Sequence, residues 1–359
     1  MSHTILIRGG RVIDPAQQID DTTDVLVRDG QIAGLGRNLG GRTDETVQAA
    51  GLIVAPGLID MHVHLREPGY EETETIETGT AAAAAGGFTA VACMPNTNPA
   101  LDNDSAIEFV LRQAARTGHV RVYPVGALTA GRQGKELAEI GLMVRAGAVA
   151  FSDDGEGIAD ASVCLRAMRY TSMFDRLFIQ HCEDPTLSCG GVMNVGPTAT
   201  RLGLPGIPAI SEIAMVQRDI LLARQAGVRY HVAHVSTAGA VELVRAAKRS
   251  GQRVTAEVTP QHLLLNDEAC AGFDTNTKMK PPLRTAADVQ ACREGVRDGA
   301  IDCLVTDHAP HGREAKEHEF QYAPFGIIGL ETALPLFVEA LITTGMVDWP
   351  RLVASRAER

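Results

Sequence analysis

The sequence contains no cluster of basic residues and no long apolar segment. Its 33 lysines and arginines are outnumbered by 44 acidic residues, which gives a formal net charge of −11. Because nucleic acids are polyanions, this balance argues against a nucleic-acid partner and favours a small molecule. The most apolar run, residues 80–94, is shorter than the roughly 20 residues that span a bilayer, so we expect no membrane segment.

Cysteine is scarce and follows no pattern. The seven cysteines are an odd number, and none belongs to a Cys-x-x-Cys motif. Disulfide frameworks use even, regularly spaced sets and are rare in the cytosol. The first eight residues also lack the basic segment and apolar stretch of a secretory signal. We therefore expect free thiols and a cytoplasmic protein.

The composition is that of an ordinary globular chain. Of its 359 residues, 45% are hydrophobic and 21% are charged, which supplies ample material for a core. This excludes disorder, collagen and a small disulfide-stapled fold. The length fits two domains, or one α/β barrel of about 250 residues with a small appendage.

Residues 1–52 have the sequence pattern of a small β domain. Asp29-Gly30 lies between two β-rich runs and is a strong hairpin signal, and Gly9-Gly10 indicates another turn. The pattern predicts a small antiparallel sheet with strands at 4–7, 11–13, 24–27 and 31–35.

From residue 53 to residue 345, apolar strands alternate with alanine-rich helical stretches. The predicted strands are 58–64, 88–94, 120–125, 148–151, 177–181, 230–234, 253–258 and 301–306. The predicted helices are 74–85, 105–117, 135–146, 209–226, 238–249, 286–297 and 330–343. Eight such units predict an α/β fold, a (β/α)8 TIM-type barrel. The polar tail, residues 346–359, has no strand pattern, and we expect a truncated end that leaves the small β domain without its C-terminal strands.

Five polar side chains stand where predicted barrel strands end. His62 and His64 are two residues apart, so they point to the same side of their strand. His181, His234 and Asp307 close three further strands. Barrel enzymes place their sites at this rim, and buried polar groups without partners cost roughly several kcal/mol each. The set predicts a metal centre suited to Zn2+, with Mn2+ or Co2+ as alternatives. A packed histidine pair is the other interpretation of the His-x-His motif alone.

A centre with two ions needs a bridging anion. Either a carboxylated lysine at the end of the fourth strand or a carboxylate from the next loop supplies it. The fourth strand runs into Phe151-Ser-Asp-Asp-Gly155 and contains no lysine. Asp154, or else Asp153, is therefore the predicted bridge, and a simple Asp-Asp-Gly turn is the alternative.

Seven sequence blocks together resemble the type I dihydroorotases of the amidohydrolase superfamily. They are GLIDMHVHLREPG (57–69), GGFTAVACMPNT (86–97), FSDDG (151–155), QHCED (180–184), VAHVS (232–236), PPLR (281–284) and TDHAPH (306–311). The resemblance extends over residues 1 to about 345. It implies a β-sandwich part joined to a barrel, a homodimer, and the reversible interconversion of N-carbamoyl-L-aspartate and L-dihydroorotate in pyrimidine biosynthesis.

The same resemblance assigns residues to roles. It implies two Zn2+ ions per subunit, one held by His62, His64, Asp154 and Asp307 and the other by Asp154, His181 and His234. The substrate contacts that it implies are Arg66, Asn96, His311, Phe325 and Gly326. Many relatives have asparagine where this chain has Lys280, which puts one substrate hydrogen bond in doubt.

The chemistry agrees with these roles. Opening or closing a cyclic amide needs a strong nucleophile, and a divalent cation lowers the pKa of water to about 7. Asp307 beside the ions is suited to moving protons as general base and acid. The planar guanidinium group of Arg66 is suited to binding a substrate carboxylate through two hydrogen bonds. Asn96 and His311 are further candidate contacts of this anion. Each role has an alternative. Asp307 could serve only as a metal ligand, Arg66 could be an ordinary surface arginine, and Asn96 could cap a turn.

The other histidines carry no comparable argument. We expect His308 to lie behind the metal ligands, and the remaining ones to be structural or solvated, namely His3, His119, His231, His262 and His318. Residues 309–326 form a loop after the last strand that is suited to closing over substrate. Residues 189–208 look irregular, and we expect them to be mobile or to pack against a partner.

Two other functions compete with this interpretation. A related hydantoinase, dihydropyrimidinase or allantoinase would use a carboxylated lysine and would not need Arg66. A non-catalytic dihydroorotase-like partner of aspartate transcarbamoylase would have lost metal ligands, whereas this chain keeps all six.

Overall fold

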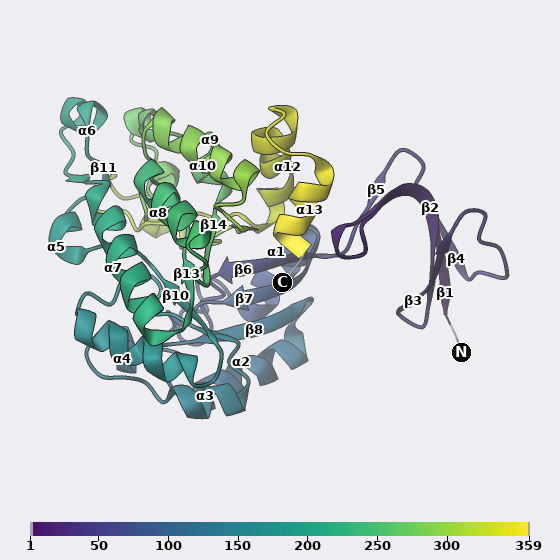
Figure 1. Ribbon diagram of the computed structural model, residues 1–359, viewed down its shortest axis with the longest axis horizontal. Coiled ribbons are helices and arrows are strands. Elements are labelled where there is room, and N and C mark those ends of the chain that lie inside the picture. The colour runs from purple at the N-terminus through teal and green to yellow at the C-terminus, as the bar shows by residue number, and fades with distance from the viewer. Residues whose placement is uncertain (1–2, 358–359) are drawn as a thin grey trace. The chain divides into compact units, whose positions relative to one another are not determined.

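The computed structural model describes residues 3–357 (Figure 1). The chain falls into two compact units. Residues 1–58 and 347–359 form the first, and residues 59–346 form the second.

The first unit contains a five-stranded sheet. Its strands are β1 (Thr4–Asp14), β2 (Ile19–Arg28), β3 (Gln31–Gly36), β4 (Glu45–Gln48) and β5 (Ile53–Val54). β2 pairs antiparallel with both β1 and β3, but β4 and β5 both pair parallel with β1. The predicted strands therefore pair antiparallel as expected, but the sheet as a whole is mixed because of β4 and β5, which were not predicted.

Turns were predicted at two glycine-containing positions of this sheet, and the structure has a turn at one of them. Arg28 pairs with Gln31, and Asp29 (φ 53°) and Gly30 (φ 76°) form the tight turn between them. Positive φ at both central residues is the requirement of a type I′ hairpin, so this prediction is confirmed. The predicted turn at Gly9-Gly10 was wrong, because the register shifts there within the single strand β1. Gly9 (φ 70°) allows this irregularity.

The polar tail contributes a helix to the first unit. α13 (Trp349–Ala357) begins after Asp348, whose carboxylate accepts the backbone N–H of Arg351 at 2.9 Å. Leu352 and Val353 are buried. The prediction considered only strands for this segment and missed a helix start with an aspartate before Trp349-Pro350.

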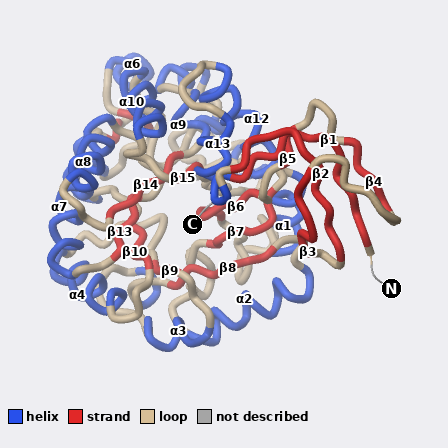
Figure 2. Tube along the Cα trace, turned by 45° about the vertical axis from the view of Figure 1, so that its right-hand side comes forward, coloured by secondary structure: helices blue, strands red, loops and turns tan. Residues whose placement is uncertain are grey.

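The second unit is a nearly closed barrel of eight strands, as predicted. They are β6 (Leu58–Val63), β7 (Phe88–Cys93), β8 (Arg121–Gly126), β9 (Ala150–Phe151), β10 (Leu177–Gln180), β13 (Arg229–Val232), β14 (Val254–Val258) and β15 (Cys303–Leu304). A parallel bridge between Val63 and His308 joins the two ends of the sheet. Figure 2 shows the strands as a red ring enclosed by blue helices. Buried side chains on the strands, or directly after them, form a hydrophobic cluster that includes Met94, Val125 and Ile179.

Helices cover the outside of the barrel. They are α1 (Ile76–Ala85), α2 (Asp104–Thr117), α3 (Ile140–Ala146), α4 (Ala161–Ser172), α7 (Ile210–Ala226), α8 (Ala238–Arg249), α10 (Ala286–Asp298) and the 3-10, α and π turns of residues 330–343. The prediction missed α4, which begins at the N-cap Asp160 and buries one face that includes Val163 and Met168. It also began α3 too early, since residues 135–139 are not helical.

The segment predicted to be irregular, residues 189–208, is built of short elements. β11 (Met193–Asn194) pairs with β12 (Gly206–Ile207), and α6 (Pro197–Leu202) lies between them in the chain. Val192 and Met193 share a buried cluster with Leu283 and Phe320. The segment therefore packs on the chain itself.

The seven cysteines are all free. Within the described residues, no helix has both the length and the apolar character needed to cross a membrane.

Candidate metal centre

The structure brings together the six residues predicted to hold metal. His62 and His64 lie at the end of β6, and each of the others follows a different strand of the barrel: Asp154 after β9, His181 after β10, His234 after β13 and Asp307 after β15. All except the partly exposed Asp307 are buried. Burial and convergence at one rim follow from the parallel barrel.

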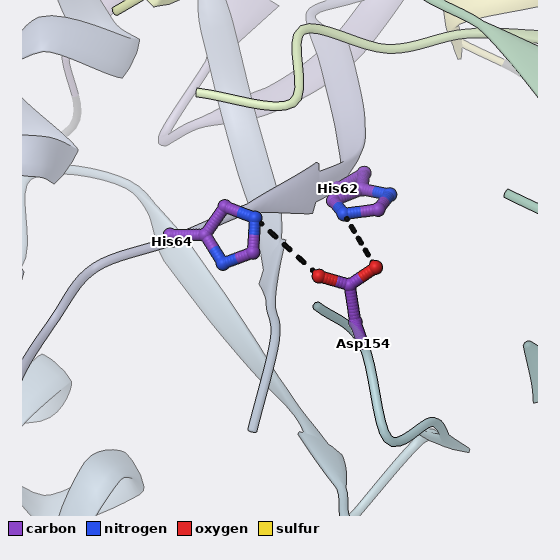
Figure 3. A group of neighbouring side chains, drawn as sticks. All are labelled: His62, His64 and Asp154. Carbon is purple, nitrogen blue, oxygen red and sulfur yellow. Dashed lines mark ion pairs between the residues drawn. The ribbon is translucent and has the colours of Figure 1, made fainter. Parts of the chain in front are cut away.

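Asp154 lies at the centre of the cluster. Its Oδ1 is 3.4 Å from Nε2 of His62, 3.7 Å from Nδ1 of His181 and 3.6 Å from Nε2 of His234. Its Oδ2 is 3.6 Å from Nε2 of His64 (Figure 3). Asp154 therefore belongs to two groups of potential ligands, one with His62 and His64 and one with His181 and His234. In each group, the ligand atoms lie within 4.8 Å of one another.

Several atoms of this cluster lack a protein partner. Nε2 of His62, Oδ1 of Asp154 and Nε2 of His181 are buried and have no hydrogen bond. Nδ1 of His181 and Nε2 of His234 face each other at 2.9 Å. Buried polar atoms without partners are costly, and imidazole nitrogens with carboxylates are suitable ligands for divalent ions. The donor set and its orphaned atoms fit a divalent metal centre.

The two aspartates of the cluster are anionic at neutral pH. Burial opposes ionisation of Asp154, but the nearby His62, followed by His181 and His234, holds its pKa well below the usual value. Burial likewise opposes ionisation of Asp307, and the nearby histidines, led by His62, lower its pKa. Both side chains can therefore act as charged ligands or accept a proton.

The side chains of Asp153 and Asp154 point in different directions. Asp153 turns to the loop after β8, where its carboxylate accepts the backbone N–H groups of Leu128 (2.8 Å) and Thr129 (3.0 Å) and the Thr129 hydroxyl. It is absent from both ligand groups. Asp153 therefore anchors a loop, and Asp154 faces the histidines.

The predicted substrate residues lie around this rim. The side-chain oxygen of Asn96 is 2.7 Å from Nδ1 of His64, so it accepts the ring N–H. Arg66 donates from Nε to the carbonyl oxygen of Pro310 at 3.1 Å. Nε2 of His311 lies 2.7 Å from the carbonyl oxygen of Phe325, next to Gly326. This contact uses the Nε2–H of His311 to hold the Phe325–Gly326 segment.

Lys280 has a local partner. Its Nζ is 3.1 Å from Oε1 of the buried Glu183. Both residues line a pocket of about 440 Å3 that reaches His181 and Phe325. Lys280 thus stands at the wall of a cavity beside the metal centre.

The sequence reasoning missed two polar side chains at the site. Glu257 is the next-to-last residue of β14, and its Oε1 lies 2.6 Å from Nδ1 of His62. Arg132, in the loop after β8, donates from Nη1 to the backbone oxygen of Asp154 at 2.5 Å. Glu257 occupies the same strand-end position as the predicted ligands, and that position was the available signal. For Arg132 the sequence offered none.

His308 lies behind the ligands. Its Nδ1 accepts the backbone N–H of Gly329 at 3.1 Å, and its Nε2 faces Glu74 at 3.1 Å. Both ring nitrogens are therefore occupied away from Asp154.

Comparisons with known proteins agree with this site. The family described as Dihydro-orotase-like matches residues 51–240. A dihydroorotase from Pelotomaculum thermopropionicum is 54% identical over 343 residues, which covers 96% of this chain and 80% of that protein. A dihydroorotase from Syntrophus aciditrophicus is 52% identical over 351 residues, 97% of this chain and 82% of that protein.

Solved structures show the same architecture. An L-hydantoinase (dihydropyrimidinase) from Arthrobacter aurescens superposes with a TM-score of 0.87 at 26% identity, covering 99% of this chain and 80% of that one. The barrel and the histidine–aspartate cluster define an enzyme of the amidohydrolase type. The sequence relatives identify the family within this class of enzymes. The chain belongs to the dihydroorotase family.

Proposed function

We propose that this chain catalyses the reversible closure of N-carbamoyl-L-aspartate to L-dihydroorotate and water, a step of pyrimidine biosynthesis. The observation that carries the proposal is the convergence of four histidines and two aspartates on one barrel rim, with Asp154 shared by two ligand groups. The dihydroorotases at 54% and 52% identity support the choice of reaction.

The proposed cofactor is a pair of Zn2+ ions. His62, His64, Asp154 and Asp307 would hold one ion, and Asp154, His181 and His234 the other. Mn2+ and Co2+ suit the same donors. When bound, such ions would polarise the amide carbonyl of the ring and lower the pKa of water.

Asp307 is the proposed general base and acid. Its Oδ1 lies 2.9 Å from Nε2 of His64, and its lowered pKa keeps it charged at neutral pH. In ring opening, water adds to the ring carbonyl carbon and the bond from that carbon to the ring nitrogen breaks. Asp307 takes a proton from the attacking water and returns it to the departing nitrogen. Ring closure is the reverse.

Arg66, Asn96, His311 and the Phe325–Gly326 segment are the proposed substrate contacts. The guanidinium of Arg66 suits the ring carboxylate, which an overall charge of −11 would otherwise repel. The side-chain oxygen of Asn96 is occupied by His64, which leaves its NH2 group to donate. Lys280, paired with Glu183, lines the pocket that also reaches Phe325.

Purified protein tests the proposal by metal analysis combined with two assays. We expect two Zn2+ ions per chain and turnover of dihydroorotate, with little turnover of dihydrouracil, which has no carboxylate for Arg66. Preference for dihydrouracil would contradict the proposed substrate. A metal-free, inactive protein would favour the supporting role beside aspartate transcarbamoylase.

We also propose that the enzyme is a cytoplasmic homodimer. The seven free cysteines support a reducing compartment. Sedimentation of the purified protein tests the dimer, and a monomeric mass at micromolar concentration would contradict it.

A further inference from the structure

Glu257 is a buried carboxylate at the metal centre to which the proposed mechanism gives no role. It is the next-to-last residue of β14, a barrel strand that supplies none of the six proposed ligands. Its exposed fraction is 0%. A charged carboxylate at this depth needs partners for both oxygens.

Both oxygens of Glu257 have such partners. Oε1 lies 2.6 Å from Nδ1 of His62 and accepts the backbone N–H of His234 at 3.2 Å. Oε2 lies 3.0 Å from Nε2 of His231. The other nitrogen of His231 is 2.7 Å from the hydroxyl of Thr255, on the same strand as Glu257. The carboxylate is thus fixed from three directions.

These contacts select one tautomer of the neutral His62 ring, the form that can bind a cation. An ionised carboxylate only accepts hydrogen bonds, so in this form Nδ1 of His62 carries the proton and Nε2 has the lone pair. That Nε2 is the buried atom without a partner, 3.4 Å from Asp154. Glu257 therefore presents the free nitrogen of His62 to the place where a cation fits.

One oxygen of Glu257 also connects the two ligand groups. His62 belongs to the group with His64, whereas His234 belongs to the group with His181. Oε1 contacts the ring of the first and the backbone of the second. Its position is held in turn by His231, which the sequence interpretation treated as structural or solvated.

We propose that Glu257, held by His231, is a positioning residue that orients His62 and ties it to the His234 segment so that both ligand groups bind metal tightly. This rests on the proposed metal-dependent function. It goes beyond it by assigning a role to the buried Glu257–His231 pair.

The test is the metal affinity of two variants, measured by competition with a chelator. Glu257→Ala removes the acceptor, and Glu257→Gln keeps the shape but weakens the acceptor. We expect a loss of affinity of roughly 10- to 100-fold for Glu257→Ala and a smaller loss for Glu257→Gln. Circular dichroism checks that the variants fold.

Asp219→Asn is the matched control. Asp219 is equally buried, but its partners Gln180 and Arg218 are not among the proposed ligands. We expect this variant to lose thermal stability and to keep the metal affinity of the wild type. Unchanged affinity in both Glu257 variants, or an equal loss in Asp219→Asn, would overturn the positioning role. If the wild type binds metal but does not turn over dihydroorotate, the proposed reaction fails and the positioning role is still decided by the affinities.

Discussion

Oδ1 of Asp307 lies 2.9 Å from Nε2 of His64, so the proposed general base contacts a proposed metal ligand directly. The pair joins the end of β15 to the end of β6, the two strands at which the barrel closes. Asp307 is more exposed than the buried members of the cluster, which leaves part of its carboxylate accessible to solvent. Position and access together distinguish its role from that of Asp154.

Asp307→Asn should separate metal binding from proton transfer. The amide keeps an oxygen for the metal but cannot take a proton, so we expect most of the metal to remain while kcat falls by roughly 100- to 10,000-fold. Elemental analysis and the dihydroorotate assay measure the two effects. Unchanged turnover would remove Asp307 from the proton-transfer role.

Asp154→Ala should instead lose metal from both positions. Its carboxylate is the only member common to the two ligand groups of the described chain. We expect less than one ion per chain and no measurable turnover. Asp153→Asn is the control, since Asp153 binds the backbone of Leu128 and Thr129. It should lower the melting temperature while the protein still binds two ions, and equal metal loss in the two variants would contradict this assignment.

Arg66→Gln tests the recognition of an anionic substrate. Hydrogen bonds to charged groups contribute about 1.5–3 kcal/mol, so KM for dihydroorotate should rise roughly 10- to 100-fold. Metal content should stay constant, since Arg66 is outside both ligand groups. A KM equal to that of the wild type would show that the substrate carboxylate binds elsewhere.

The barrel and the cluster of histidines and aspartates could be predicted because their signals are local. The strands that carry the cluster are apolar runs with polar side chains at or just after their ends, and the parallel topology brings those ends together. His62 and His64 needed only the two-residue period of a strand. Helix α4 also has a local signal, since the side chain of Asp160 caps its start.

The remaining features depend on contacts between distant residues. Glu257 is 195 positions from His62, and although its place near a strand end is a signal for the site, the local sequence does not identify His62 as its partner. Asp153 and Asp154 are neighbours in a loop, where no period determines which side chain faces the centre. Only the partners of Asp153 in the loop after β8 distinguish them.

Two lysines hold the loop after the last strand by hydrogen bonds, and the protonation of one of them changes with pH. Nζ of Lys316 donates to the carbonyl oxygens of Pro324 (3.1 Å) and Gly326 (2.9 Å). Nζ of Lys278 donates to those of Gln321 (2.9 Å) and Ala323 (2.6 Å). Burial, followed by the charge of Lys278, lowers the pKa of Lys316 to about 8. The proposed substrate segment is therefore held by an ammonium group that loses its proton in mildly alkaline solution.

Raising the pH through 8 should weaken this hold and raise KM for dihydroorotate. Lys316→Gln should have a raised KM already at pH 7, without a further step near pH 8.

The effect of Lys316 on the stability of the fold runs the other way, because raising the pH increases stability while it weakens substrate binding. Because the pKa of Lys316 is lower in the folded than in the unfolded chain, the unfolded chain binds more protons between pH 8 and 10.5. The contribution of Lys316 to the free energy of unfolding therefore increases over this range, which urea titrations of the two proteins measure as a difference. A KM step near pH 8 that persists in Lys316→Gln would assign the titration to another group.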